Sequence, residues 1–295
     1  MGQDAGMNFL QVAILRWYQA NLTASFAAGP FPFGLAFDGA HIWVANNSGN
    51  SVSKLRACDG AILGTFAVGT FPEDVAFDGA CIWVANFGSD NVTRLRASDG
   101  STLGTFAAGT GPEGVTFDGA NVWVTNSGSH NVTKLRASDG VSLGAFAVGN
   151  QPRAAAFDGH HIWVTNRLSN NVIKLRASDG ANLGTFAAGT FPLGVAFDGV
   201  NIWVVNANSN NVIKLRASDG ANRGTFAVGS GPRAVAFDGK NMWVANTTSN
   251  NVTKLRARDG ANLGTFSVGS APGNVAFDGA NIWVSNSVSD TVSKL

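Results

Sequence analysis

Ionisable side chains recur at one position of this sequence. A proline is found every 40 residues, and the residue after it is Glu73, Glu113, Arg153 or Arg233 in four places. Carboxylates can ligate divalent cations or act as general bases. Guanidinium groups bind carboxylates and phosphates through paired hydrogen bonds. The position therefore suits either metal-assisted chemistry or the binding of a charged ligand.

The residues around this proline are segregated by charge along the chain. The acidic ones fall in the second and third copies of a repeat, the basic ones fall in the fourth and sixth copies, and bulky apolar residues lie between them. An acidic arc that faces a basic arc is typical of a surface that binds a polar partner. The competing interpretation is neutral drift at tolerant loop positions. The predicted ligand-binding residues are Phe33, Glu73, Asp74, Glu113, Arg153, Arg167, Leu193 and Arg233.

A 40-residue repeat must position these side chains. The triplet Phe-Asp-Gly occurs seven times at intervals of 40 residues without insertion, from 37–39 to 277–279, and a tryptophan follows each copy at a fixed distance. One copy contains four short strand patterns, at 75–77, 82–86, 92–97 and 105–108, with Asp-Gly turns between the first and second and between the third and fourth. Asp-Gly supplies the positive φ of tight hairpins. This pattern predicts an all-β, seven-bladed β-propeller with four antiparallel strands per blade.

The two ends of the sequence are expected to meet in one blade. The seventh copy stops in its third strand, and residues 23–29 match the fourth strand of the other copies. We therefore predict that the N-terminal strand completes the last blade, so that the propeller spans residues 22–295 and residues 1–21 form an extension. The apolar stretch 9–18 favours a short helix there, with a degenerate export signal as the alternative.

Loops at one end of the ring carry most of the variation between copies. These loops join the fourth strand of one blade to the first strand of the next, and the second strand to the third within a blade. We call this end the top face. The residue after the proline should precede the innermost strand and line the rim of the central channel. We expect a protein, a peptide or a small polar ligand to bind at this rim.

Composition narrows the function classes. The formal net charge is +1, so we expect neither nucleic acid nor a membrane as a partner. Cys58 and Cys81 have no partner spacing typical of metal sites, so we expect no metal or other cofactor. A monomer is expected. A cytoplasmic location is favoured because no basic residue precedes the apolar stretch, and export stays open.

The repeat resembles a known family. The stretches WVANTTSNNVTKL and DGANLGTFSVGSAPGNVAF, within 241–277, resemble the 40-residue YVTN-type propeller repeat and, more broadly, NHL repeats and streptogramin lyases. The lyase resemblance implies a histidine base and a divalent metal. Those lyases characteristically have Trp-Phe-Thr-Glu, where this chain has Trp-Val-Ala-Asn or Trp-Val-Thr-Asn, and none of the four histidines lies in copies five to seven. No catalytic residue is therefore carried over.

Two functional hypotheses follow from these patterns. The first is a non-enzymatic binding scaffold that uses the top face and the channel mouth. The second is a metal-dependent lyase or lactonase-like enzyme, with Glu73, Asp74 or Glu113 as metal ligands or base and His130 nearby. A recently amplified array with little selected function is a third interpretation of the near-identical copies.

Overall fold

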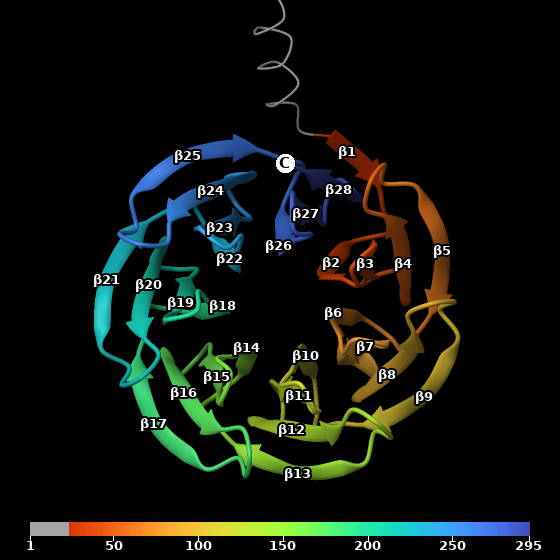
Figure 1. Ribbon diagram of the computed structural model, residues 1–295, viewed down its shortest axis with the longest axis horizontal. Helices are drawn as coiled ribbons and strands as arrows, with labels where there is room; N and C mark the ends of the chain where they lie inside the picture. Colours follow the sequence, from red (N-terminus) through yellow and green to blue (C-terminus); the bar gives the residue numbers. More distant parts are fainter. Residues whose placement is uncertain (1–23) are drawn as a thin grey trace, which may run out of the picture.

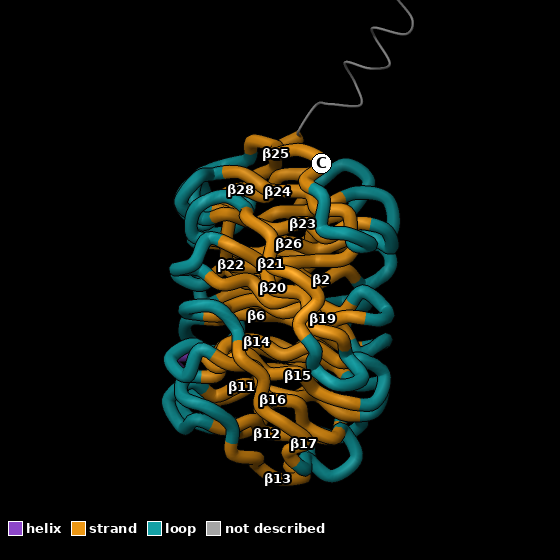
Figure 2. The backbone as a smooth tube through the Cα atoms, turned by 90° about the vertical axis from the view of Figure 1, so that its left-hand side faces the viewer, coloured by secondary structure: helices purple, strands orange, loops and turns teal. Residues whose placement is uncertain are grey.

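A computed structural model describes residues 24–295, which form a closed ring of seven four-stranded sheets around a central channel (Figure 1). In the side view the strands lie between two layers of loops, one on each face of the ring (Figure 2). The seven-bladed propeller predicted from the repeat is confirmed. The predicted helix of the N-terminal extension lies outside the described residues.

The strands have the same bounds in almost every blade. The first, innermost strands are β2 (Pro32–Phe37), β6 (Pro72–Phe77), β10 (Pro112–Phe117), β14 (Pro152–Phe157), β18 (Pro192–Phe197), β22 (Pro232–Phe237) and β26 (Pro272–Phe277). The second strands are β3 (His41–Asn46), β7 (Cys81–Asn86), β11 (Asn121–Asn126), β15 (His161–Asn166), β19 (Asn201–Asn206), β23 (Asn241–Asn246) and β27 (Ile282–Asn286).

The outer half of each blade is equally regular. The third strands are β4 (Ser51–Arg56), β8 (Asn91–Arg96), β12 (Asn131–Arg136), β16 (Asn171–Arg176), β20 (Asn211–Arg216), β24 (Asn251–Arg256) and β28 (Thr291–Lys294). The fourth strands are β5 (Ile62–Ala67), β9 (Thr102–Ala107), β13 (Ser142–Ala147), β17 (Asn182–Ala187), β21 (Asn222–Ala227), β25 (Asn262–Ser267) and β1 (Ala24–Ala27). A short 3₁₀ helix, η1 (Phe87–Ser89), occupies one top loop.

Strand pairing closes the ring as the sequence predicted. The last sheet has the order β1-β28-β27-β26, so the first described strand is the outer strand of the seventh blade. Ser25 pairs with Ser293 and Phe26 with Val292 in antiparallel register. This pairing leaves no unpaired third strand at the junction, where an exposed edge would invite association with another chain.

The core lies between neighbouring blades. The second and third strands are nearly fully buried, and six of the seven repeated tryptophans have no exposed surface. Each tryptophan packs against the phenylalanine of the fourth strand in its own blade, as in Trp83 and Phe106, whose ring centroids are 5.5 Å apart. Burial of such large aromatic surfaces explains why both positions are repeated in every copy.

The aspartate of each Phe-Asp-Gly triplet does more than form a turn. Asp78 Oδ1 accepts hydrogen bonds from the backbone N–H groups of Ala80 and Cys81, and its Oδ2 accepts one from Trp83 Nε1 at 2.7 Å. The same indole-to-carboxylate bond occurs in all seven copies. This contact satisfies the one polar group of an otherwise buried side chain.

Two contacts join neighbouring blades on the bottom side. Gly100 has φ +75°, and the Phe66 ring of the preceding blade occupies the place where a Cβ would stand. Lys54 Nζ donates to the Ala97 carbonyl of the next blade at 2.7 Å and lies 5.1 Å from the Trp43 ring centroid. The repeated basic residues of the third strand are therefore structural. Among residues 24–295, no helix has the length and apolarity needed to cross a membrane.

Candidate functional site

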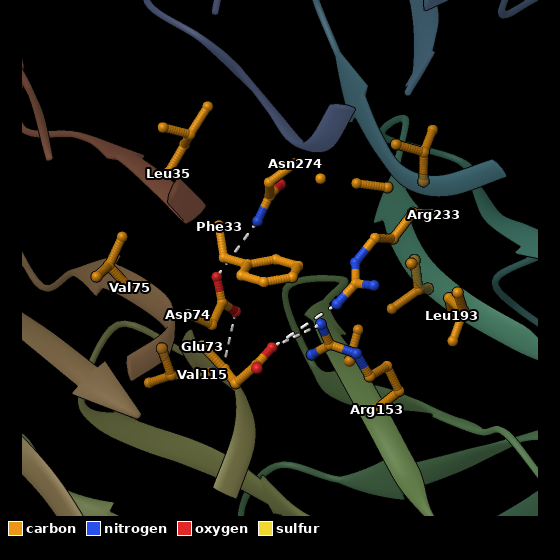
Figure 3. Close-up of a pocket in the computed structure, with 16 residues that line it drawn as sticks. Phe33, Leu35, Glu73, Asp74, Val75, Val115, Arg153, Leu193, Arg233 and Asn274 are labelled. Carbon is orange, nitrogen blue, oxygen red and sulfur yellow. Dashed lines mark hydrogen bonds and ion pairs between the residues drawn. The ribbon is translucent and has the colours of Figure 1, made fainter. Parts of the chain in front are cut away.

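A cavity of about 210 Å³ lies in the top half of the central channel. All sixteen lining residues are the second, third or fourth residues of the seven first strands (Figure 3). The residue after the proline thus stands inside the innermost strand, not before it as predicted. Because the seven strands converge on the axis, residues far apart in sequence meet here.

An irregularity in the backbone turns these positions toward the channel. In every blade the pairing of the first with the second strand shifts register just after the proline, as between Pro112 and Gly114. Bulges of this kind re-aim side chains next to functional sites. In the third blade Thr125 Oγ1 accepts from the Gly114 N–H at 2.8 Å and donates to the Arg153 carbonyl at 2.9 Å. This threonine holds the backbone of two blades in place.

Arg153 is the centre of an ion-pair network across three blades. Its Nε lies 2.9 Å from Glu113 Oε2, and one of its terminal nitrogens lies 3.2 Å from Glu73 Oε2. The other terminal nitrogen donates to the Glu113 carbonyl at 3.1 Å. Burial alone would lower the pKa of Arg153, but Glu113 and Glu73 raise it above its ordinary value. Arg153 therefore stays charged and fully engaged.

The predicted acidic and basic arcs pair with each other. Six of the eight predicted residues line the cavity, whereas Glu113 and Arg167 lie behind it. Glu113 accepts from Arg153 and also lies 3.4 Å from a terminal nitrogen of Arg167. Arg167 donates in addition to Gln151 Oε1 at 2.8 Å. The predicted open surface of opposite charges is instead a largely satisfied cluster.

Asp74 is the titratable carboxylate of the cavity wall. Its Oδ2 accepts from the Val115 N–H at 3.1 Å, and Asn274 Nδ2 lies 3.5 Å from its Oδ1. Burial raises the pKa of Asp74 to about 6, against the lowering effect of the Val115 hydrogen bond and of Arg153. Burial also raises the pKa of Glu73, although Arg153 and Arg233 oppose the shift. The cavity therefore changes its charge in weakly acidic solution.

Arg233 differs from the other two guanidinium groups. Its nearest carboxylate oxygen, Glu73 Oε2, is 3.7 Å away, which is an ion pair but too long for a hydrogen bond. Its Nε is buried and has no hydrogen-bond partner within residues 24–295. The Phe33 ring lies 4.4 Å from its Cζ. Burial, with the charge of Arg153, lowers the pKa of Arg233 to about 10.

Several residues of the site were not predicted from the sequence. Asn274 belongs to the third position of the first strand, where other blades have mostly Gly or Ala, and a comparison of that column would have shown it. Asn47 donates to Glu73 Oε1 at 3.0 Å from a top loop. The apolar floor includes Leu35, Val195 and Val235. This position is apolar in every copy, as a core position would be. A comparison of the copies therefore could not show that it lines a cavity.

The proposed metal ligands do not fit a metal site. Glu73 and Glu113 already accept from Arg153, and a cation would have to displace that guanidinium. His130 Nδ1 accepts instead from the Gln151 N–H at 3.2 Å in a top loop. Across residues 24–295, no three His, Cys, Asp or Glu side chains come together in a way that could hold a metal ion.

Solved structures with the same architecture include enzymes. The chain is similar to hydrazine synthase from Kuenenia stuttgartiensis (TM-score 0.81, 20% identity, 90% of this chain and 95% of that chain). It is also similar to a catalytically inactive variant of virginiamycin B lyase from Staphylococcus aureus (TM-score 0.81, 18% identity, 92% and 98%). A streptogramin B lyase structure matches with a TM-score of 0.80 at 18% identity, over 92% and 96% of the two chains.

These likenesses establish the fold. No protein-family description matches the sequence, and no curated protein is similar to it. The chain is a seven-bladed β-propeller. At identities of 18–20% the neighbours say nothing about the activity of this chain.

Proposed function

We propose that this propeller is a binding protein that holds a small ligand in the top half of its channel. The support is a largely buried cluster of six charged residues, with side-chain exposure up to 27% at Arg233, at positions where the scaffold needs none. The equivalent second position holds Phe33, Leu193 or Gly273 in other blades. Burying ions costs several kcal/mol each unless they are well paired. A cluster of charged residues that lowers the stability of the fold is expected where those residues bind a ligand.

Size and shape support a small ligand. A cavity of about 210 Å³ is smaller than the roughly 300–1,000 Å³ typical of sites for drug-sized molecules. A macromolecular partner would contact the rim, where Phe31 and Phe71 are exposed, but only a side chain or terminus of it would enter. Binding without catalysis is favoured over the lyase or lactonase alternative because two of the three candidate carboxylates, Glu73 and Glu113, are committed to arginines.

Filling the cavity tests this proposal. Gly273→Leu places in the seventh blade the side chain that Leu193 carries in the fifth, and because an added Cβ would stand 3.2 Å from the Phe33 ring, that ring must shift to admit it. A thermal-shift screen with small acids, amines, neutral molecules, Mg²⁺ and Ca²⁺ is run on both proteins. We expect a ligand that stabilises the wild type and leaves Gly273→Leu unaffected. The control is Ser101→Val, which introduces the residue found at the equivalent bottom hairpin position, Val141, and should respond like the wild type.

Two results would count against the proposal. If every stabilising compound acts equally on the wild type and on Gly273→Leu, the channel is not the site. If Mg²⁺ or Ca²⁺ stabilises the wild type but not Gly273→Leu, the result supports the metal-dependent enzyme instead. The ion-pair cluster would then have to rearrange when the metal binds.

A further inference from the structure

Hydrogen-bonding capacity is distributed unevenly among the charged groups of the cavity. All three nitrogens of Arg153 have partners, in Glu73, the Glu113 side chain and the Glu113 carbonyl. Both oxygens of Glu73 are used, since Oε1 accepts from Asn47 and Oε2 from Arg153. Glu113 likewise has a guanidinium at each oxygen. The two glutamates therefore have little capacity left for a ligand, and Asp74 accepts from the Val115 N–H at 3.1 Å and, more weakly, from Asn274 Nδ2 at 3.5 Å.

The spare capacity lies on Arg233. Within residues 24–295, the Arg233 side chain makes no hydrogen bond, and its Nε is buried. Its weak ion pair with Glu73 is shared with Arg153, which holds the shorter distance. A buried donor without an acceptor is costly. The side chain is 27% exposed, and its terminal nitrogens can present a guanidinium fork to the two oxygens of a carboxylate.

Apolar side chains surround the free guanidinium. Phe33 covers one face of Arg233, and it can lean toward it because the blade between them has Gly273, whose added Cβ would stand 3.2 Å from the Phe33 ring. Leu193 lies on the Arg233 side of the cavity (Figure 3), and Leu35 and Val235 are further apolar residues of the lining. These contacts suit an aromatic ring or a short alkyl chain attached to the acid.

Resting on the binding function proposed above, we infer that the ligand is a small organic carboxylate with an apolar body, and that Arg233 binds its carboxylate. A cationic ligand would find Glu73 and Glu113 occupied by arginines, and although Asp74 could accept from it, it would share the cavity with Arg153 and Arg233. A phosphate dianion would bring two charges to one free guanidinium inside a cluster with three acidic and three basic residues. A monocarboxylate matches both the single free cation and the small apolar space.

Three compounds of one shape but different charge test the inference. Benzoate, benzamide and benzamidine are titrated into the wild-type protein at pH 7.5, with calorimetry and thermal shift as readouts. We expect benzoate to bind at least ten-fold more tightly than benzamide, and benzamidine not to bind. This comparison needs no variant, so it does not depend on the folding of a mutant.

Variants then assign the carboxylate to Arg233. Arg233→Gln should weaken benzoate binding at least ten-fold and make benzoate and benzamide nearly equal. Arg233→Lys, which keeps the charge but loses the fork, should fall between. Arg223→Gln, on the exposed outer strand β21, should bind like the wild type.

The outcomes separate this inference from the proposed function. If benzamide or benzamidine binds in the cavity and benzoate does not, the carboxylate inference is wrong while the binding function stands. If benzoate binds equally to the wild type and to Arg233→Gln, Arg233 is not its partner and the inference is also wrong. If the broader screen finds no compound that distinguishes the wild type from Gly273→Leu, the binding function itself fails.

Discussion

Arg153 and Glu73 are separated by 80 residues and by one intervening blade, yet their side chains form an ion pair of 3.2 Å in the channel. The intervening blade contributes Glu113 to the same guanidinium. Three first strands are therefore tied together at the top of the channel by one side chain. The geometry makes Arg153 a structural centre as well as part of the cavity wall.

Loss of Arg153 should be costly. Arg153→Gln leaves two mostly buried carboxylates without their main partner, and removing one member of a buried pair typically costs about 3–5 kcal/mol. The measurement is urea unfolding. Arg176→Gln, which breaks the exposed pair with Asp179, is the matched control and should cost about 0–1 kcal/mol. Equal losses in the two variants would show that the buried network contributes no more than a surface pair.

Asp74 should make stability depend on pH. Its pKa is raised from 3.8 to about 6 in the folded protein, so the folded state binds the proton more tightly and the wild type loses stability as pH rises from about 4 to 6. Asp74→Asn removes this loss and keeps an acceptor for the Val115 N–H. We expect the stability of Asp74→Asn relative to the wild type to grow by about 2 kcal/mol between pH 4.5 and 7.

Asp99 gives a control with a pKa shift in the opposite direction. Hydrogen bonds from the Ser101 backbone and hydroxyl lower the pKa of Asp99 to about 2. Its contribution is therefore lost only below pH 4, and the difference between Asp99→Asn and the wild type should stay flat from pH 4.5 to 7. Thermal melts of all three proteins at four pH values suffice. A flat difference for Asp74→Asn as well would mean that its carboxylate is better solvated than its position implies.

Two glycines with similar backbone angles separate strain from packing. Gly79 has φ +100° and open space around an added Cβ, whereas Gly100 has φ +75° and lies against the Phe66 ring. Gly79→Ala should cost about 1–2 kcal/mol for the left-handed conformation. Gly100→Ala should cost about 1–3 kcal/mol more, because the phenylalanine of the neighbouring blade must move. If denaturant midpoints of the two variants coincide, the contact between blades is softer than described.

Phe71 has an uncommon conformation for an aromatic residue. Its φ is +51° and its side chain is 51% exposed, while two of the six equivalent residues in other blades are glycines, Gly111 and Gly231. Relief of strain in Phe71→Gly should offset the entropy of the added glycine, so its stability should stay within about 1 kcal/mol of the wild type. Phe191→Gly also loses the contact with Arg167 at 5.4 Å and should be less stable than Phe71→Gly. The reverse order of melting temperatures would contradict this account.

The sequence predicted the scaffold almost completely because each copy repeats the same short-range signals. Asp-Gly turns, alternating strands and the tryptophan position define a blade, and residues 23–29 match its missing strand. The hydrogen bond from Trp83 to Asp78 was not predicted, although the spacing of five residues is present in every copy. A repeated pair of residues shows that both are needed and does not show that they touch.

The sequence predicted which positions carry the charged residues of the cavity, but it did not predict which of these residues contact one another. Variation after the proline pointed to Glu73, Glu113, Arg153 and Arg233. Whether these charges face an open mouth or pair with each other depends on the distance across the ring and on the bulge in each first strand. Neither quantity is encoded in a comparison of copies. Hence the sequence could suggest a charged rim but not that the Arg233 guanidinium, among those lining the cavity, would be under-satisfied.

The cavity-lining residues all fall within three consecutive positions of the first strands, and apart from Arg153, whose ion pairs join three blades, the residues that hold blades together lie elsewhere in the repeat. Recognition and architecture are thereby assigned to separate parts of one 40-residue module. A combinatorial library confined to those three positions would alter the chemistry of the pocket while the tryptophans, turns and lysines stayed untouched. The ring is thus suited to engineering, since new specificities can be selected without redesigning the frame.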